Sequence, residues 1–314
     1  MSNNTLTETL LLPGGSDRRT WEGSGRFSGL RRLYRRSNWI IRACFGLALL
    51  VFVTALAAPW LAPYSPTDQT LLSRLRPPIP FERSLAAHPL GTDELGRDML
   101  SRTLHGVRLT LAIAFTGSLV SLVLGGGLGL LAGYLGGWLD ETVMGLVDIQ
   151  IAVPFTLIAL LAVAVFGSDL TILIAVIGLN GWERYARVVR GGLLSLRESP
   201  FVEAARAAGA GWFRIVVIHC LPNLVSPVIV LWTLTFSEVI LLESSLSFLG
   251  LGVQPPTATL GSMVGLGRNY LVSSPWIALV PALAIMLIAL IMLLLGDWLR
   301  DALDVRISRG NRSG

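Results

Sequence analysis

Lysine is absent from this sequence of 314 residues, and all 25 basic residues are arginine. A phosphate-binding loop of the G-x-x-x-x-G-K-[ST] type needs a lysine, so the chain cannot bind ATP by that route. The two cysteines, Cys44 and Cys220, are far apart, and the three histidines lack the spacing of zinc ligands. We therefore expect neither a disulfide nor a metal site. Charged residues make up only 14% of the chain, and its Arg clusters are more typical of topology signals than of nucleic-acid binding.

The chain is instead rich in apolar residues, at 53% of its length, and its mean hydropathy is +0.65. A helix needs about 20 consecutive apolar residues to cross a bilayer. We predict an all-α integral membrane protein with six transmembrane helices. They are expected within residues 43–61, 109–139, 149–167, 170–182, 223–242 and 270–296. The fourth reaches full length only by continuing towards residue 189.

Six spans place both termini on one side of the membrane. That side receives eighteen of the arginines and the other side receives seven, which predicts cytoplasmic termini. We divide the chain accordingly. Residues 1–38 form a disordered basic tail, 39–108 the first helix and a periplasmic loop, 109–298 the core transmembrane domain, and 299–314 a cytoplasmic C-terminal tail.

Glycines recur every four residues in the second predicted span, at Gly125, Gly129, Gly133 and Gly137. Such a repeat places small residues on one stripe of a helix, where a second helix backbone can approach closely. We interpret the stripe as a helix-packing seam, with a glycine hinge as the alternative.

The segment "EAARAAGAGWFRIVVIHCLPN", residues 203–223, lies between two predicted spans. Ser199 can cap a helix and Pro200 suits its first turn. The alanines that follow give a helix with a small, nearly featureless face, and Gly209 then breaks or turns it. The pattern favours a rigid helix–turn–helix used for docking, and an amphipathic helix resting on lipid headgroups is the alternative.

The same segment resembles the EAA loop of ABC-transporter permeases, with E-A-A, three residues, glycine and later Leu-Pro. The matching residues are Glu203, Ala204, Ala205, Gly209, Leu221 and Pro222. Four further blocks resemble the dipeptide, oligopeptide and nickel permease family, C-type subunit: "HPLGTDELGRDMLSR", "VDIQIAVP", "ESSLSFLGLGVQPP" and "GDWLRDALD". Two positions depart from that pattern, at "ATLG" (residues 258–261) and at Val305, and the first bears on how a binding protein would dock.

The resemblance implies a type I ABC importer (MetI-like) permease fold and a non-catalytic subunit forming half of a translocation pathway for di- or oligopeptides. It implies a homologous B-type permease, two ATP-binding subunits and an extracytoplasmic solute-binding protein as partners. It also implies a location in a bacterial cytoplasmic (inner) membrane. ATP and Mg would be bound by the partner ATPases, with no cofactor in this chain. The loop at 199–222 would couple ATP hydrolysis to movement of the spans.

Polar residues in the fifth predicted span are functional candidates, because such residues are costly in a membrane. Ser237, Glu238, Glu243 and Ser244 could line the pathway, or they could bond to the partner permease. Asp148 is expected to bond to the Arg-rich loop. Two other functions stay open at this stage: a same-family importer of nickel chelates or glutathione-like solutes, and a proton-coupled secondary transporter.

Overall fold

The computed structural model describes residues 38–310, with side chains as far as residue 302. The chain divides into two units, Met1–Asn38 and Trp39–Gly314, and the second is the one described below. The predicted tail of residues 1–38 lies, except for Asn38, outside the described residues. Within the described part every element is a helix, which confirms the all-α prediction.

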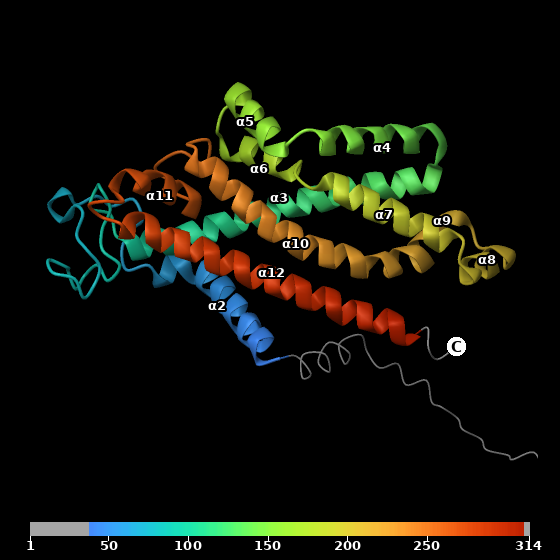
Figure 1. Ribbon diagram of the computed structural model, residues 1–314, viewed down its shortest axis with the longest axis horizontal. Helices are drawn as coiled ribbons and strands as arrows, with labels where there is room; N and C mark the ends of the chain where they lie inside the picture. Colours follow the sequence, from blue (N-terminus) through green and yellow to red (C-terminus); the bar gives the residue numbers. More distant parts are fainter. Residues whose placement is uncertain (1–37, 311–314) are drawn as a thin grey trace, which may run out of the picture. The chain divides into compact units, whose positions relative to one another are not determined.

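Four helices are long and apolar enough to cross a membrane. They are α2 (Trp39–Leu61), α3 (Met99–Leu135), α10 (Leu221–Phe248) and α12 (Trp276–Gly310). The candidate span that contains α10 begins before that helix. It also includes α9 (Trp212–Arg214) and a π-helical turn, η2 (Ile215–Cys220), which lead into α10. Helices α3, α10 and α12 run beside one another, and α2 packs on α3 and α12 (Figure 1).

The predicted third span is bent rather than straight. Helices α4 (Gly137–Ala152) and α5 (Phe155–Phe166) meet at an angle of 91°. Pro154 lies at the bend, and Val153 before it has extended backbone angles (φ −107°, ψ 127°). Proline has no amide hydrogen and disfavours the helical conformation of the preceding residue, so the helix ends here.

The predicted fourth span is not a single helix. Helix α6 (Leu170–Gly178) has nine residues, and a separate helix, α7 (Trp182–Arg197), follows it. Gly181 between them is in the left-handed region, with φ +86°. With the bent α4–α5 pair counted as one span, the described residues hold at most five candidate spans. The expected number of six is therefore not confirmed.

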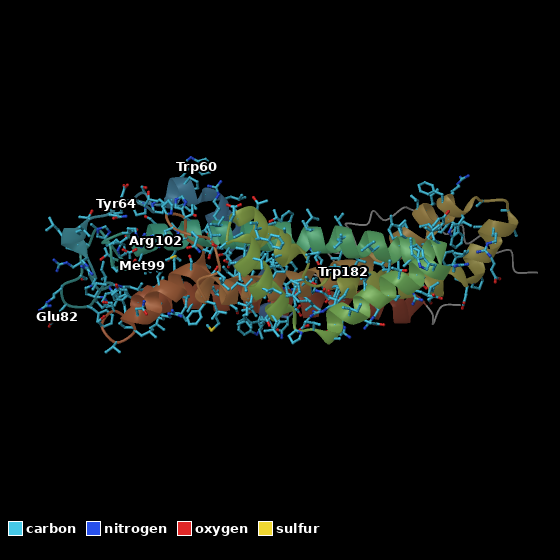
Figure 2. All side chains as sticks on the ribbon, turned by 90° about the horizontal axis from the view of Figure 1, so that it is seen from above. Trp60, Tyr64, Glu82, Met99, Arg102 and Trp182 are labelled. Atoms are coloured by element: carbon cyan, nitrogen blue, oxygen red, sulfur yellow. The ribbon has the colours of Figure 1, made fainter. Side chains whose placement is uncertain are left out.

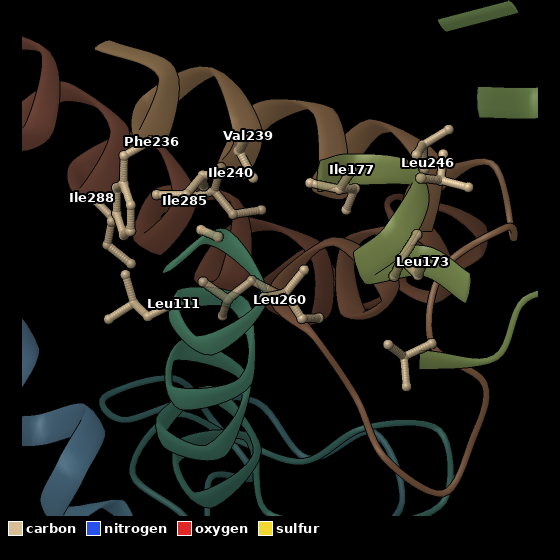
Figure 3. Packing of buried hydrophobic residues seen from close by; sticks show 14 of the residues in the cluster. Leu111, Leu173, Ile177, Phe236, Val239, Ile240, Leu246, Leu260, Ile285 and Ile288 are labelled. Atoms are coloured by element: carbon tan, nitrogen blue, oxygen red, sulfur yellow. The ribbon is translucent and has the colours of Figure 1, made fainter. Parts of the chain in front are cut away.

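The main core lies where α3, α6, α10, α11 (Leu260–Gly267) and α12 converge. Aliphatic side chains dominate it, with one aromatic ring from α10. Its members include Leu111, Leu173, Ile177, Phe236, Ile240, Leu260, Ile285 and Ile288 (Figure 3). This core fixes the short helices α6 and α11 to the long ones.

Residues 62–98 and α11 lie at one end of this unit, called here the α11 end, and α8 (Pro200–Ala207) lies at the other, the α8 end (Figure 1). Short turns η1 (Leu71–Ser73) and η3 (Arg268–Tyr270) also belong to the α11 end. The indole nitrogen of Trp276 donates a 3.1 Å hydrogen bond to the carbonyl of Thr92. The segment of residues 62–98 is thus tied to the start of α12. Figure 2 shows Tyr64, Glu82, Met99 and Arg102 at this end.

Helix α12 continues past the predicted end of the core domain at residue 298 and ends at Gly310. Near that boundary the ring of Trp298 meets Phe45 of α2 edge to face, with centroids 5.2 Å apart. The described part of the predicted C-terminal tail, residues 299–310, is therefore helical.

Candidate functional site

Helix α8 is anchored by one buried side chain. Val202 is fully buried in a cluster with Leu193 of α7, Ile215 of η2 and Leu224 of α10. The predicted cap is absent: the hydroxyl of Ser199 donates to the carbonyl of Leu196, and no side-chain bond caps α8. Pro200 does occupy the first turn, as predicted. The helix is thus held by packing on its inner face.

The outer face of α8 is small, and none of the described residues covers it. Glu203, Ala204 and Ala207 are exposed, and Ala205 is half-buried against the cluster. Alanine side chains leave a flat surface on which another backbone can lie close. The face could therefore fit into a cleft of a partner with little loss of side-chain entropy.

The turn after α8 is closed by two backbone hydrogen bonds. The amide of Ala210 donates to the carbonyl of Ala205, and the amide of Gly209 donates to the carbonyl of Arg206, each at 3.0 Å. This is the Schellman pattern, in which the residue after the helix adopts a left-handed conformation. Gly209 has φ +81°, which glycine adopts without steric cost.

Trp212 fixes the far side of the turn, a role that the sequence analysis missed. The guanidinium carbons of Arg197 and Arg206 lie 5.2 Å and 5.4 Å from its ring centroid. Tyr134, near the end of α3, stacks on the same ring at 5.8 Å. These contacts join α3, α7 and α8 through one side chain. The signal in the sequence for this role was an aromatic residue that follows a turn with two glycines.

Leu221 and Pro222 are exposed at the start of α10, next to the π-helical turn η2. Pro222 lacks the amide hydrogen that a regular helix would use at this point, and a π-helical turn precedes it. Helix α8 packs against η2 through Val202 and Ile215. The six residues of the EAA motif therefore lie in one region of the structure.

Three of the four predicted seam glycines contact α7. A methyl group on Gly125 would lie 2.1 Å from the carbonyl oxygen of Trp182, and one on Gly129 would lie 2.5 Å from that of Ala186. A methyl group on Gly133 would lie 3.1 Å from a methyl carbon of the Leu193 side chain. Gly137 does not belong to this seam.

Helix α3 ends at Leu135, and Gly137 begins α4 with φ +57° and open space around it. The repeat of four continues in the sequence beyond the point where the helix stops. Gly136, with φ +64°, ends α3 and turns the chain.

Ion pairs also hold α4 against α7. Arg190 donates two hydrogen bonds to the carboxylate of Asp140, and Arg187 donates to Asp148 at 2.8 Å. The hydrogen bonds to Asp140 raise the pKa of the Arg190 guanidinium above its ordinary value. Asp148 therefore does bond to an arginine of the predicted Arg-rich region.

The polar residues of α10 divide into two groups. Ser237 donates to the carbonyl of Ala289 in α12, and Glu238 forms a 2.6 Å ion pair with Arg184 of α7. Glu243 is fully buried and accepts a 2.6 Å hydrogen bond from Ser247.

One carboxylate oxygen of Glu243 and the hydroxyl of Ser244 have no partner among the described side chains. Ser237 is satisfied within this chain, so it is a poor pathway candidate. Glu243 and Ser244 keep unpaired polar atoms. In the described part no three His, Cys, Asp or Glu side chains are grouped to hold a metal ion.

The described residues form a helical membrane bundle with a short, small-faced helix at one end. The fold agrees with an inward-facing structure of the MetNI methionine ABC transporter, at a TM-score of 0.53 and 21% identity over 65% of this chain and 97% of that one. Residues 125–309 match the model of the binding-protein-dependent transport system inner membrane component family, and the chain belongs to that family.

Residues 31–78 also match the N-terminal transmembrane domain of oligopeptide transport permease C. The chain is 42% identical to a di/tripeptide transport system permease of Pseudomonas aeruginosa, covering 82% of this chain and 86% of the relative. It is 39% identical to an oligopeptide transport permease of Mycobacterium bovis (91% and 96%) and 38% identical to a glutathione transport permease of Pectobacterium atrosepticum (88% and 90%). The chain is thus a non-catalytic membrane component of a transport system.

Proposed function

We propose that this chain forms half of the translocation pathway of an ATP-driven importer of di- or oligopeptides. Helix α8, which ends in a Schellman turn, is the observation that supports a role in coupling ATP hydrolysis to transport. Its buried side holds it rigidly through Val202, and its exposed alanine face is free to seat on another subunit. The relatives named for peptide transport support the substrate class.

The partners follow from the same assignment. One homologous B-type permease completes the pathway, two ATP-binding subunits bind ATP and Mg, and an extracytoplasmic solute-binding protein delivers the solute. Glu203, Ala204, Ala205 and Gly209 are proposed to form the contact with an ATP-binding subunit. Movement of α8 would be transmitted to α7 and α10, because Val202 packs on both.

The excess of arginine on the α8 side favours a cytoplasmic α8 end. Helix α2 runs towards the α11 end and α12 runs away from it (Figure 1), so both termini are proposed to lie on the cytoplasmic side of the cytoplasmic membrane. Membership of a binding-protein-dependent family favours ATP-driven import over the proton-coupled alternative. Glutathione remains a second candidate solute, because one relative of similar identity is named for it.

Co-purification and uptake test the proposal together. The chain is expected to copurify with a second permease and two ATP-binding subunits. In vesicles, uptake of a labelled dipeptide should need the binding protein and ATP, and it should survive collapse of the proton gradient. Uptake by the chain alone, or uptake that stops with the gradient while ATP is held constant, contradicts the proposal. Preference for glutathione over dipeptides would select the second solute.

A further inference from the structure

A cavity of about 260 Å³ lies at the α11 end, beside the first turns of α3. One stripe of α3 provides most of its wall, through Arg102, His105, Arg108, Leu109 and Ala112. Residues 66–67, after α2, and 256–258, before α11, close the other sides. Among the described residues no carboxylate lines this cavity, and its polar wall is formed by two guanidinium groups and an imidazole.

Arg102 lines this cavity and two neighbouring ones, and it is buried, with 4% of its surface exposed. Its Nε lies 3.3 Å from Asp93, but its Nη1 has no hydrogen-bond partner among the described residues. Asp93 cannot neutralise Arg102 fully, because the same carboxylate accepts hydrogen bonds from the side chain of Arg97 and from two loop amides. A buried guanidinium nitrogen without an acceptor is costly, so this nitrogen calls for a hydrogen-bond acceptor.

One oxygen of the neighbouring Glu94 carboxylate accepts a 2.8 Å hydrogen bond from Arg97, and the other is buried without a partner among the described residues. Glu94 and Arg102 share the lining of two neighbouring cavities, but Glu94 does not line this one. A water molecule shared by Glu94 and Arg102 is the competing explanation of the unpaired nitrogen, and the experiment below separates it from the proposal.

We propose that this cavity is an oxyanion-binding site, in which Arg102, His105 and Arg108 hold a phosphodiester or a carboxylate. Arginine suits both groups, since its planar fork pairs with two oxygens. Arg108 is the last charged residue of α3 before an apolar run that reaches residue 139, so the site lies where helix α3 passes from polar to apolar surroundings. Leu109 and Ala112 extend the wall with apolar surface, which suits the acyl chain of an anionic phospholipid.

The test uses the full-length chain in its purified membrane assembly, stripped of lipid. Phosphatidylglycerol or phosphatidylcholine is titrated in, and bound lipid is counted by native mass spectrometry. Arg108→Gln should weaken the tightest phosphatidylglycerol binding at least about tenfold, since it removes a charge-assisted contact. Arg74→Gln is the matched control, because Arg74 is an exposed arginine at the same end and lines neither this cavity nor those beside it. Phosphatidylcholine should bind more weakly throughout.

A second arm distinguishes a carboxylate source from the lipid. Binding of dialanine and of dialanine amide is measured by calorimetry on the same samples. Loss of dialanine binding in Arg108→Gln and in His105→Asn, with weak binding of the amide, supports an oxyanion site that takes a peptide carboxylate.

Equal lipid and dialanine binding in wild type, Arg108→Gln and His105→Asn overturns the proposal and leaves Arg102 satisfied by water. Unchanged thermal unfolding of Arg108→Gln, an exposed position, shows that any loss reflects binding.

Discussion

The amide of Ala210 donates a 3.0 Å hydrogen bond to the carbonyl of Ala205, five residues earlier. This bond brings the chain back across the end of α8, and it requires the left-handed backbone of Gly209, with φ +81°. The exposed face of α8 is therefore aimed by the backbone of one residue.

Replacing Gly209 with valine should misdirect α8. A β-branched residue at this φ costs about 1–3 kcal/mol of backbone strain. We expect normal abundance in the membrane, weakened association with ATP-binding subunits and lost uptake, measured by pull-down and by dipeptide transport. Gly211→Val is the matched control, because Gly211 has an extended backbone (φ −64°, ψ 150°) and open space around it. Equal ATPase binding in both variants contradicts a coupling role for α8.

A bulky residue on the exposed face of α8 should block docking without unfolding the helix. Ala207 is exposed, so Ala207→Trp adds an indole to the surface only. We expect unchanged membrane abundance and thermal stability, together with loss of stimulated ATP hydrolysis. Ala87→Trp places the same side chain on an exposed alanine at the α11 end and should leave hydrolysis unchanged. Normal hydrolysis in Ala207→Trp would show that this face meets no ATPase.

The seam between α3 and α7 should not tolerate a single added methyl group. In Gly129→Ala the new carbon would lie 2.5 Å from the carbonyl of Ala186, so the two helices must separate, at a cost of about 1–3 kcal/mol. Gly127→Ala, on the same helix, meets nothing within 4 Å and should be neutral or slightly stabilising. Thermal unfolding of the two purified variants makes the comparison. Similar stability would mean that the seam can open freely.

The ion pair of Arg190 and Asp140 should behave as a unit. Its side chains are 31% and 17% exposed, so solvent screens it in part, and each single charge reversal should destabilise the chain by about 1 kcal/mol or more. Exchanging the two residues, with Asp140→Arg and Arg190→Asp together, should recover most of the loss in a thermal unfolding experiment. Additive losses in the double variant would show that α4 and α7 are held by other contacts.

Local chemistry made part of this structure predictable. Gly209 was expected at a turn because only glycine adopts its φ freely, and the seam from Gly125 to Gly133 follows from helical periodicity. Gly137 was assigned wrongly because a repeat in sequence does not reveal that Gly136 has already ended the helix.

Tertiary arrangement was harder to predict. Apolar length alone suggested straight spans, and it could not show the 91° bend at Pro154 or the break at Gly181. The stacking partner of Trp212 is Tyr134, which lies 78 positions earlier in the sequence, so no local pattern contained this contact.

The hydrogen bond from Trp276 to Thr92 joins residues 184 positions apart. A ribosome has therefore released the whole segment of residues 62–98, and most of the remaining chain, before the residue that secures it is made. The α11 end is thus completed late in biosynthesis, and until α12 is made the segment of residues 62–98 lacks this hydrogen bond. Nascent chains stalled before residue 276 should leave this loop open to protease, whereas full-length chains should protect it.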